Sequence, residues 1–485
     1  MKNIFVACIL IAANLQLACN NHRSSGERRE TVVALHLPKN YLKQMPMNEH
    51  LFLVATPSQR SGARSVLEKI PDINIDDHLC ISSISDDRQE TKDSAAECIK
   101  KFEIVSKSKI ACIVNAPNED SVDLGASLRS EFSASHGMKH EESVYFTDKA
   151  EMKAKIASND PSVPMAKQIM IDYEAYHDLH NDAFSEKISA EIASKLGSDW
   201  SKLIIKPVGL SGSAGIESFI NTPDAIDKIT SHFDGSIRHH LSESAFIIEE
   251  FIEGKVLRFD GLMQGGQVAV NFTSEYLVPP KEFYQEAKLT MYTLITDEEK
   301  VAENLEFASK VMKALEYQDG VFHLEAIRNK KTGTLYFLEN AARPGGGLSE
   351  TLRQVGYNPI EAFVNHQLNL PFSFDIDQQK VFNVVEIKAP SFDSDSLRIL
   401  ELDPRAAEGY ESYDQSISWL TSRKQIFSRT LGLLSFIHED EDVVLSESRE
   451  FAKNFTARVK MESGEYYFQE SILKDGVWSK PFSAE

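Results

Sequence analysis

The stretch from Gly320 to Gly347, GVFHLEAIRNKKTGTLYFLENAARPGGG, decides the fold. Two apolar strand patterns flank the turn residues NKKTG at 329–333, and this arrangement predicts a β-hairpin. Glu325 and Glu339 stand at equal distances from Thr332 in the turn, so a regular hairpin places their carboxylates opposite each other. Opposed like charges destabilise a sheet unless water, a shared proton or a cation relieves them, and oxygen ligands of this kind favour Mg²⁺. A magnesium site and an exposed pair of acids are therefore the two interpretations.

The residues that follow Glu339 extend this candidate site. Strand alternation puts Arg343 on the Glu339 face and Asn340 on the other face. A guanidinium in that place can hold a phosphoryl or carboxylate oxygen through two hydrogen bonds, or it can pair with the two glutamates. His323 shares the Glu325 face opposite Ala341 and is expected to pack or hydrogen-bond, with positioning of substrate or metal as the alternative.

A second candidate site is the glycine- and serine-rich segment KPVGLSGSAGI at 206–216. It follows an apolar strand pattern at 203–208. Glycines let backbone amides approach phosphate oxygens, hydroxyls add donors, and Lys206 supplies a point charge. No GK[ST] follows the glycines, so this is not a Walker loop. A phosphate-binding loop and a flexible surface loop both fit the pattern.

The strand pattern at 245–252 is a third candidate, because it runs into the sequence IIEEFIEG at 247–254. An apolar strand that ends in acids and then glycine is typical of a plain strand and turn. The same pattern fits an adenine-binding hinge, in which the backbone of 250–252 would contact the purine edge.

Composition limits the class of protein. The 485 residues contain 52 Lys+Arg and 73 Asp+Glu, a net charge of −21, with 42% apolar and 26% charged residues. These values are typical of a globular protein of about three domains. A strongly acidic chain repels phosphate backbones, which excludes nucleic acid as the expected main partner.

The five cysteines form no CxxC pair and show no zinc spacing, which indicates a reducing compartment rather than a disulfide scaffold. The N-terminus points elsewhere, because an apolar run at 4–13 and the sequence LQLAC ending at Cys19 resemble a secretory or lipoprotein signal. A buried element, or a true start at Met45 or Met47, would also explain it. We therefore predict a cytoplasmic protein, or a membrane-associated or exported one if the signal works.

The chain divides into four predicted parts. Residues 1–48 form an extension that includes a polar linker from 20, and 49–147 form an α/β domain with strands at 50–56, 109–116 and 144–146. Residues 148–372 form a second domain, with helices predicted at 148–157, 167–196, 222–232, 301–316 and 359–370 and a hairpin turning at 265–266. Residues 373–485 form a closing α+β domain.

Taken together, the motifs resemble the ATP-grasp superfamily. TDKAEMKAKI at 147–156 is similar to its entry motif, and 206–216, 247–254 and the 320–347 hairpin are similar to its phosphate loop, adenine hinge and metal carboxylates. The ending AARPGGG looks most like the carboxylate–amine ligase branch. The resemblance implies a preceding α/β domain, two α+β lobes that clamp ATP, and a C-terminal closing segment.

The resemblance also implies roles for individual residues. Glu325 and Glu339 would hold Mg²⁺, with Mn²⁺ as a substitute, and Arg343 and Lys206 would act on the transferred phosphoryl group or the carboxylate. The residues implied to bind ATP are Lys149, Lys206, Ser211, Gly212, Ser213, Gly215, Glu249, Glu250, Phe251 and Ile252. This sequence departs from many relatives at Val256, where they have a ribose-binding Glu, and at Ala341, where they have Asn.

The implied activity is that of an ATP- and Mg²⁺-dependent ligase. It would activate a carboxylate, such as that of an amino acid, as an acyl phosphate for attack by an amine, releasing ADP and phosphate. The partners would be these small molecules, with a homodimer as the implied assembly. Two alternatives are an ATP-binding regulatory or scaffold protein with a decayed site, and carboxylation of the biotin-carboxylase type.

Overall fold

The computed structural model of the chain describes residues 30–37, 42, 45, 51–70, 74–84, 88–172, 181–210, 213, 215–239, 245–281, 290–388, 396–397, 399–404, 420–421, 430–454, 456–461 and 466–470. The signal-like segment and two predicted loop residues, Ser211 and Gly212, lie outside this set. In the described residues, no helix is both long enough and apolar enough to cross a lipid bilayer.

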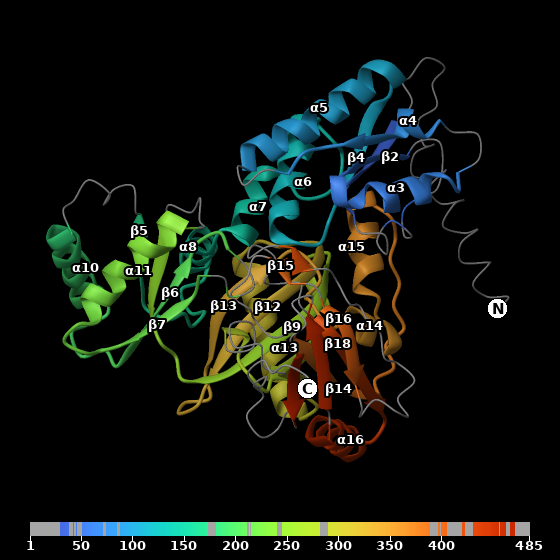
Figure 1. Ribbon diagram of the computed structural model, residues 1–485. Helices are drawn as coiled ribbons and strands as arrows, with labels where there is room; N and C mark the ends of the chain where they lie inside the picture. The colour runs from blue at the N-terminus through green and yellow to red at the C-terminus, as the bar shows by residue number, and fades with distance from the viewer. Residues whose placement is uncertain are drawn as a thin grey trace.

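The N-terminal domain is built on a parallel sheet of four strands in the order β3-β2-β1-β4. The strands are β1 Glu30–Leu35, β2 Leu51–Ala55, β3 Leu79–Ile81 and β4 Lys109–Asn115. The helices are η1 Pro57–Gln59, α3 Arg60–Leu67, α4 Ile75–His78, α5 Arg88–Ser106, α6 Glu119–Glu131 and α7 His140–Thr147. Figure 1 shows this domain in blue above the rest of the chain.

The strand β1 corrects the predicted linker over residues 20–48. It lies between β2 and β4, and both of its faces are buried. Val33 and Leu35 pack toward α5 and α6, whereas Val32 and Ala34 pack toward α3 and the second lobe described below. A chain that began at Met45 or Met47 would lack this central strand. The continuous apolar run of β1 is typical of a parallel strand covered on both sides.

The predicted strand at 144–146 is wrong, because these residues lie in α7. Ser143 and Phe146, three positions apart, are the buried residues of that helix, and a separation of three is typical of a helix rather than of an alternating strand.

The predicted helix at 167–196 is only partly correct. It begins with a strand, β5 Gln168–Asp172, in which Ile169 and Ile171 are buried and Met170 is exposed.

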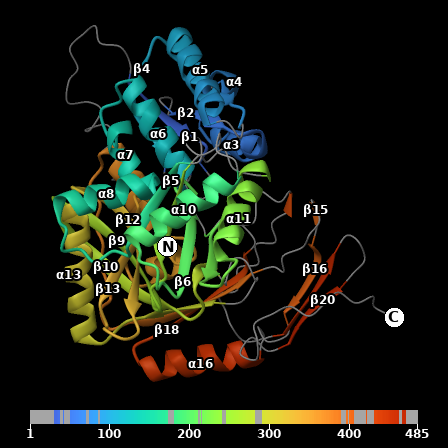
Figure 2. The same ribbon diagram turned by 90° about the vertical axis from the view of Figure 1, so that its left-hand side faces the viewer.

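The first lobe of the second domain is an antiparallel sheet in the order β5-β8-β6-β7. Its other elements are β6 Lys202–Pro207, β7 Glu217–Ile220, β8 Ala245–Glu250, α10 Asn181–Lys195 and α11 Ala225–His239. Both helices pack on one face, where alternate strand residues such as Leu203, Ile205 and Ile248 are fully buried. Lys206, Ile247 and Met170 share the other face, because they oppose one another across three strands. The lobe stands apart in green in Figure 1 and faces the viewer in Figure 2.

The second lobe is a seven-stranded sheet in the order β13-β12-β9-β10-β11-β14-β18. The strands are β9 Gly254–Gln264, β10 Gln267–Tyr276, β11 Thr290–Leu294, β12 Gly320–Asn329, β13 Leu335–Ala341, β14 Val381–Lys388 and β18 Thr430–His438. The helices around it are α8 Lys149–Asn159, α13 Glu298–Ala314, α14 Ser349–Gln354, α15 Pro359–Leu368 and α16 Glu441–Asn454. The predicted hairpin turn is confirmed at Gly265 and Gly266, which both have positive φ.

The large sheet also joins the parts of the chain to one another. One of its faces packs on α8 and α13, and the other packs on α14, α15 and the N-terminal domain. Arg129 of α6 donates to Gln367 of α15 at 3.1 Å in this buried junction. Two strands of the predicted C-terminal domain, β14 and β18, complete the same sheet, so that segment is continuous with the second lobe.

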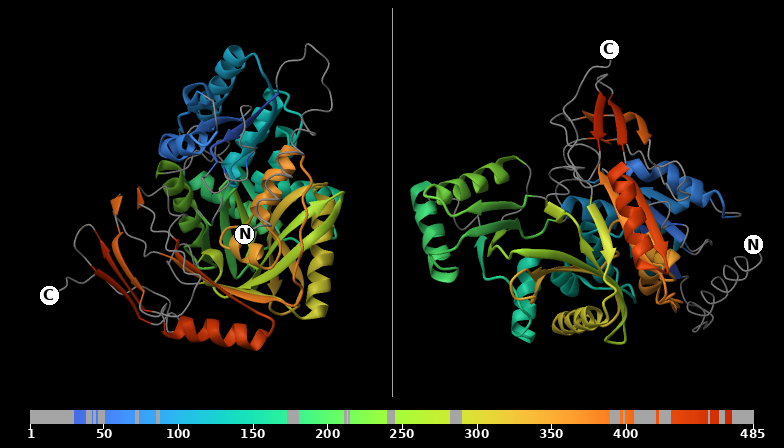
Figure 3. Two further views of the ribbon diagram at one scale, coloured as in Figure 1. Left: turned by 90° about the vertical axis from the view of Figure 1, so that its right-hand side faces the viewer. Right: turned by 90° about the horizontal axis from the view of Figure 1, so that it is seen from below.

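The remaining described strands of the tail form two small sheets. They are β15 Ser396–Leu397 with β17 Leu420–Thr421, and β16 Ile399–Pro404 with β19 Thr456–Met461 and β20 Tyr466–Glu470. Figure 2 and the left view of Figure 3 show the latter sheet to one side of α16. The predicted fold class of α/β and α+β domains is thus confirmed.

The structure contains a disulfide, although the cysteine pattern predicted a reducing compartment. Cys80 of β3 and Cys98 of α5 form a disulfide, and Cys112 is buried and outside any disulfide of the described residues. The two partners are not a CxxC pair, because 18 positions separate them, and the fold brings them together. An exclusively reducing compartment, predicted from the sequence, is therefore not supported by this bond.

Candidate functional site

The predicted pair of glutamates is at the centre of the site. Glu325 of β12 lies directly opposite Glu339 of β13, as the spacing predicts. The pairing shifts by one residue between Glu325 and Ala326, which makes Leu338 an extra residue on the turn side of Glu339. The pairs nearer the turn, such as Ala326–Phe337, would continue to a Glu325–Leu338 pair, so the bulge is what places the carboxylates opposite each other. The predicted opposition of the two carboxylates is present.

One hydrogen bond and one longer charge contact hold one oxygen of Glu325. Tyr276 donates its hydroxyl to Oε1 at 2.8 Å, and Nε2 of His323 lies 3.7 Å from the same atom. Within the described part of the chain, the other oxygen, Oε2, has no partner. Burial raises the pKa of Glu325, but its interactions with His323 and Tyr276 outweigh burial and the net shift is downward. Glu325 is therefore an ionised, oriented carboxylate.

Behind Glu325 lies a buried chain of charged groups. Arg258 donates to both oxygens of Asp260, at 2.7 and 3.0 Å, and Nδ1 of His323 lies 3.0 Å from Asp260 Oδ1. Burial raises the pKa of Asp260, but Arg258 and then His323 bring it well below its usual range. Arg258 is almost completely buried, at 1% exposure, so its charge is directed at Asp260 rather than at solvent.

Lys149 is the first residue of α8, and the Asp148 side chain caps that helix. Its Nζ lies 3.3 Å from Glu339 Oε2 and also donates to the carbonyl of Leu210 in the predicted phosphate loop. The predicted entry lysine therefore joins the metal carboxylates to that loop. This position fits a cation that contacts phosphate between the two lobes.

Lys206 pairs with Glu249, a residue that was predicted to line the adenine. Its Nζ lies 2.7 Å from Glu249, which is only 1% exposed and also pairs with Lys153 of α8. Burial raises the pKa of Glu249, but the two lysines lower it to about 2. The carboxylate of Glu249 is thus committed to lysines, so any contact with adenine would come from its backbone. The sequence reasoning missed Lys153, although it follows Lys149 by one helical turn.

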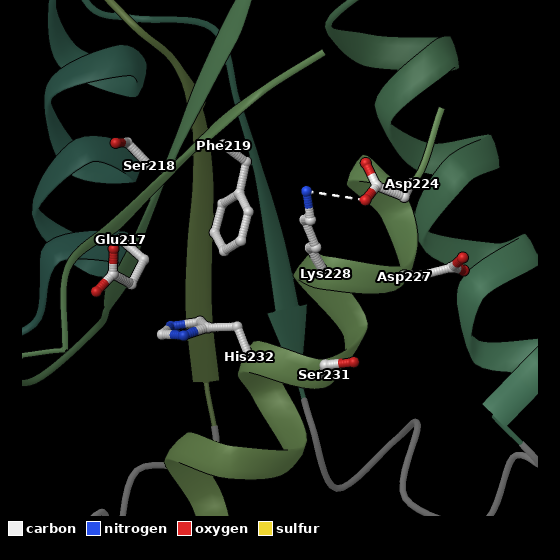
Figure 4. Close-up of a pocket in the computed structure, with 8 residues that line it drawn as sticks. All are labelled: Glu217, Ser218, Phe219, Asp224, Asp227, Lys228, Ser231 and His232. Atoms are coloured by element: carbon white, nitrogen blue, oxygen red, sulfur yellow. Dashed lines mark ion pairs between the residues drawn. The ribbon is translucent and has the colours of Figure 1, made fainter. Parts of the chain in front are cut away.

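Of the four residues predicted to bind ATP through the loop, Ser213 and Gly215 are described, and both have positive φ, 63° and 65°. Beside them an open cavity of about 560 Å³ lies between β7 and α11 on the first lobe (Figure 4). In it Lys228 pairs with Asp224 at 2.8 Å, and the rings of His232 and Phe219 lie 5.8 Å apart. None of the predicted site residues lines this cavity.

The predicted hinge lies where β8 ends. The amide of Glu250 donates to Lys167 at 3.0 Å and that of Phe251 to Lys202 at 3.1 Å, so both amides are already used. The ring of Phe251 is 39% exposed, and Met170 on the same lobe is 57% exposed. Exposed apolar side chains beside a backbone edge suit the flat face of a purine. Met170 gave no sequence signal, because it was placed in a predicted helix.

Arg343 makes a contact that the sequence could not show. It donates through Nε at 2.9 Å, and also through Nη2, to Glu119, the first residue of α6 in the N-terminal domain. Burial raises the pKa of Glu119, but Arg343 and further contacts lower it to about 2. The alternative that Arg343 pairs with Glu325 and Glu339 is therefore replaced by a pair across domains. Asn340 faces away from the site as predicted, fully buried opposite Leu324.

The donor set fits a magnesium ion bound together with phosphate. Two opposed carboxylates, Glu325 and Glu339, offer oxygens, and two cations, Lys149 and Lys206, stand where phosphate charge would be neutralised. Among the described residues, no cluster of three or more His, Cys, Asp or Glu side chains is arranged to hold a metal alone. Mg²⁺ is commonly held by one or two carboxylates and completed by phosphate and water.

Comparison with known proteins agrees with this geometry. Residues 201–352 match the family model for the ATP-grasp domain. An L-amino acid ligase from Bacillus licheniformis is 13% identical, with a TM-score of 0.61 over 88% of this chain and 98% of that one. N5-carboxyaminoimidazole ribonucleotide synthetase from Thermotoga maritima is 14% identical, with a TM-score of 0.55 over 88% and 98%. No curated protein sequence matches the chain.

A third similar structure shows ligands. It is the biotin carboxylase domain dimer of the Hydrogenobacter thermophilus 2-oxoglutarate carboxylase, in complex with MgADP, ADP and bicarbonate. It is 14% identical, with a TM-score of 0.59 over 90% of this chain and 92% of that one. Residues 201–352 are therefore similar to the ATP-grasp domain, and the chain shares its fold with these solved structures.

Proposed function

We propose that this protein is an ATP- and Mg²⁺-dependent ligase that joins a carboxylate, such as that of an amino acid, to an amine. The observation that carries the proposal is the opposed pair of Glu325 and Glu339, with Lys149 bridging Glu339 to the phosphate loop. The similarity to an L-amino acid ligase supports the same class of reaction.

The proposed reaction has two steps, because a free carboxylate is a poor electrophile and must first be activated. A free carboxylate has no adequate leaving group, so its oxygen first attacks the γ-phosphorus of ATP, the bond to the β-γ bridging oxygen breaks, and ADP leaves. The amine then attacks the acyl phosphate carbon, phosphate leaves, and the nitrogen loses a proton. Both steps require positioned charges rather than a nucleophilic side chain.

The residues of the chain supply those charges. Glu325 and Glu339 would hold Mg²⁺, which when bound neutralises charge on the phosphate oxygens. Lys149 of α8 and Lys206 of β6 would both bind the phosphates, and this requires Lys206 to share its charge with Glu249. Arg343 would bind an anionic oxygen of the carboxylate or phosphoryl group beside Glu119.

The test is ADP release with Mg²⁺ and ATP across single and paired amino acids, other amines and bicarbonate, with mass spectrometry of the products. We expect ADP only with particular pairs, together with a product of the pair mass minus water. ADP that depends on bicarbonate alone would favour carboxylation and contradict the amine ligase. Wild-type protein that forms no ADP with any member of the panel would also count against it.

A second candidate is a nucleotide-binding protein without turnover. Two departures from the family pattern favour it, Val256 and Ala341, since neither can contact ribose or metal through a polar side chain. It predicts that MgATP raises the melting temperature while no ADP forms, whatever substrate is added.

A further inference from the structure

We infer that the buried chain Arg258–Asp260–His323 is a positioning relay for Glu325, the first of the two predicted metal carboxylates. This inference rests on the proposed function, because it assigns a task to residues behind that site. Arg258, Asp260 and His323 are 1%, 3% and 7% exposed, so none of them is in contact with bulk water. Their role must lie in what they hold.

The direction of the relay follows from the donors and acceptors. A carboxylate without its proton can only accept, so His323 Nδ1 donates to Asp260 across 3.0 Å. Arg258 occupies both oxygens of Asp260 from the opposite side and so fixes that carboxylate. The imidazole is thereby oriented with Nε2 toward Glu325 Oε1, 3.7 Å away, a contact longer than a hydrogen bond that is an ion pair when the ring carries its second proton. Carboxylates that bind metal ions are commonly oriented by polar groups behind them.

Neighbouring residues keep the relay rigid and specific. The ring of Tyr292 lies 4.8 Å from the Arg258 guanidinium, and Arg258 Nη1 donates to the carbonyl of Gly346 at 2.8 Å. A Cβ placed on Gly345 would overlap Asp260, Arg258 and His323, so a glycine is required where the AARPGGG loop crosses the relay. The glycines after Arg343 thus have a packing role in addition to ending the strand.

The register of the hairpin explains why Glu325 needs this support. Ala341 lies directly opposite His323 and brings no polar group to this face of the sheet. The orientation of Glu325 therefore depends on His323 and on Tyr276, and both of them act on Oε1. With Oε1 held, Oε2 is left for the cation, opposite Glu339.

Two substitutions at His323 distinguish the contact made by Nδ1 from the contact made by Nε2. His323→Asn places an amide nitrogen near the position of Nδ1, so it keeps the contact with Asp260 and loses the donor toward Glu325. His323→Gln places its nitrogen near Nε2 and keeps that donor. His36→Gln is the matched control, because His36 is also buried, at 6% exposure, but lies in the N-terminal domain.

The experiment titrates Mn²⁺ into the full-length protein with ADP and follows the free ion by electron paramagnetic resonance. We expect His323→Asn to raise the Mn²⁺ midpoint by about 10- to 100-fold, His323→Gln to recover most of the loss, and His36→Gln to match the wild type. ADP binding without metal should be the same in all four proteins. Asp260→Asn, which keeps the shape of Asp260, should also raise the midpoint and replaces His323→Asn if that variant does not fold.

The outcomes distinguish the relay from the proposed function. A wild type that binds Mn²⁺ in the presence of ADP, with His323→Asn at the same midpoint, overturns the relay and leaves the ligase proposal standing. Equal losses in His323→Asn and His323→Gln, with weaker metal-free ADP binding, would show a merely structural histidine and also overturn it. A wild type for which ADP does not tighten Mn²⁺ binding contradicts the metal site itself, and the relay with it.

Discussion

Arg343 and Glu119, 224 positions apart, form an ion pair that ties the region similar to the ATP-grasp domain to the N-terminus of helix α6. The two side chains are 16% and 17% exposed, so the pair is mostly removed from water. The predicted substrate-binding arginine is therefore oriented by the N-terminal domain. This makes that domain part of the site rather than a separate module.

A double-mutant cycle measures the strength of that pair. With Glu119→Gln and Arg343→Gln, we expect a coupling of about 1–3 kcal/mol in the free energy of unfolding, because each partner left alone is a partly buried charge. Chemical denaturation of the four proteins gives the value. The exposed pair Glu253–Lys330 is the matched control, in which no coupling should be resolved. Equal couplings in the two cycles would contradict the assigned burial.

Lys153 should be essential for stability. Lys153→Met removes one of two cations that hold the buried carboxylate of Glu249, and we expect a loss of about 3–5 kcal/mol in the free energy of unfolding. Lys155→Met, on the same helix, should cost less than about 1 kcal/mol, because its partner Glu316 is 66% exposed. Urea unfolding measures both values. A Lys153→Met protein as stable as Lys155→Met would disprove the assigned buried contacts of Glu249 with Lys153 and Lys206.

The substitutions Gly345→Ala and Gly346→Ala test how closely the loop packs on the charged residues below it. A Cβ at Gly345 would overlap three buried polar side chains, whereas a Cβ at Gly346 would have nothing within 4 Å. We therefore expect Gly345→Ala to lower the free energy of unfolding by about 1–3 kcal/mol, and Gly346→Ala by less than about 0.5 kcal/mol. Thermal and urea unfolding compare the two variants. A reversed order would contradict the described loop.

His36 should make the free energy of unfolding depend on pH. Burial lowers the pKa of His36 from 6.5 to about 4, and its Nε2 lies 2.6 Å from Ser82 Oγ. The unfolded chain binds a proton at this residue below pH 6.5 while the folded chain does not, so stability is full above that pH and is lost toward pH 4.

The same shift sets the size of the effect. As the pH falls from 7 to 4, the wild type should lose about 3 kcal/mol of unfolding free energy relative to His36→Gln. Other titrating groups are common to both proteins and cancel in this comparison. Denaturation curves at several pH values give the result, and a difference that stays constant across the range would rule out a buried neutral His36.

The sequence predicted the pair Glu325–Glu339 correctly but not the register of the turn. The pairs nearer the turn, such as Ala326–Phe337, would continue to Glu325–Leu338, and only the bulge at Leu338 restores the predicted pair. The strand Glu30–Leu35 was missed, because its four apolar residues lie between polar segments and resemble a linker when the neighbours in the sheet are unknown.

The partners of the site residues could not be predicted. Lys153 and Glu249 are 96 positions apart, and Arg343 and Glu119 are 224 positions apart, so only the packed fold brings them together. The same holds for Arg258 and His323, 65 positions apart, which both contact Asp260. Motifs thus predicted which residues form the site, and tertiary packing determines what holds those residues.

The central claim is that Glu325 and Glu339 form the metal site of an ATP-dependent ligase. The most direct measurement is ADP release by the wild type, Glu325→Gln and Glu339→Gln with a productive pair of substrates, beside Glu303→Gln as a surface control paired with Arg328. We predict that both site variants lose at least about 100-fold in rate while Glu303→Gln keeps the wild-type rate. Wild-type rates in Glu325→Gln and Glu339→Gln would contradict the account.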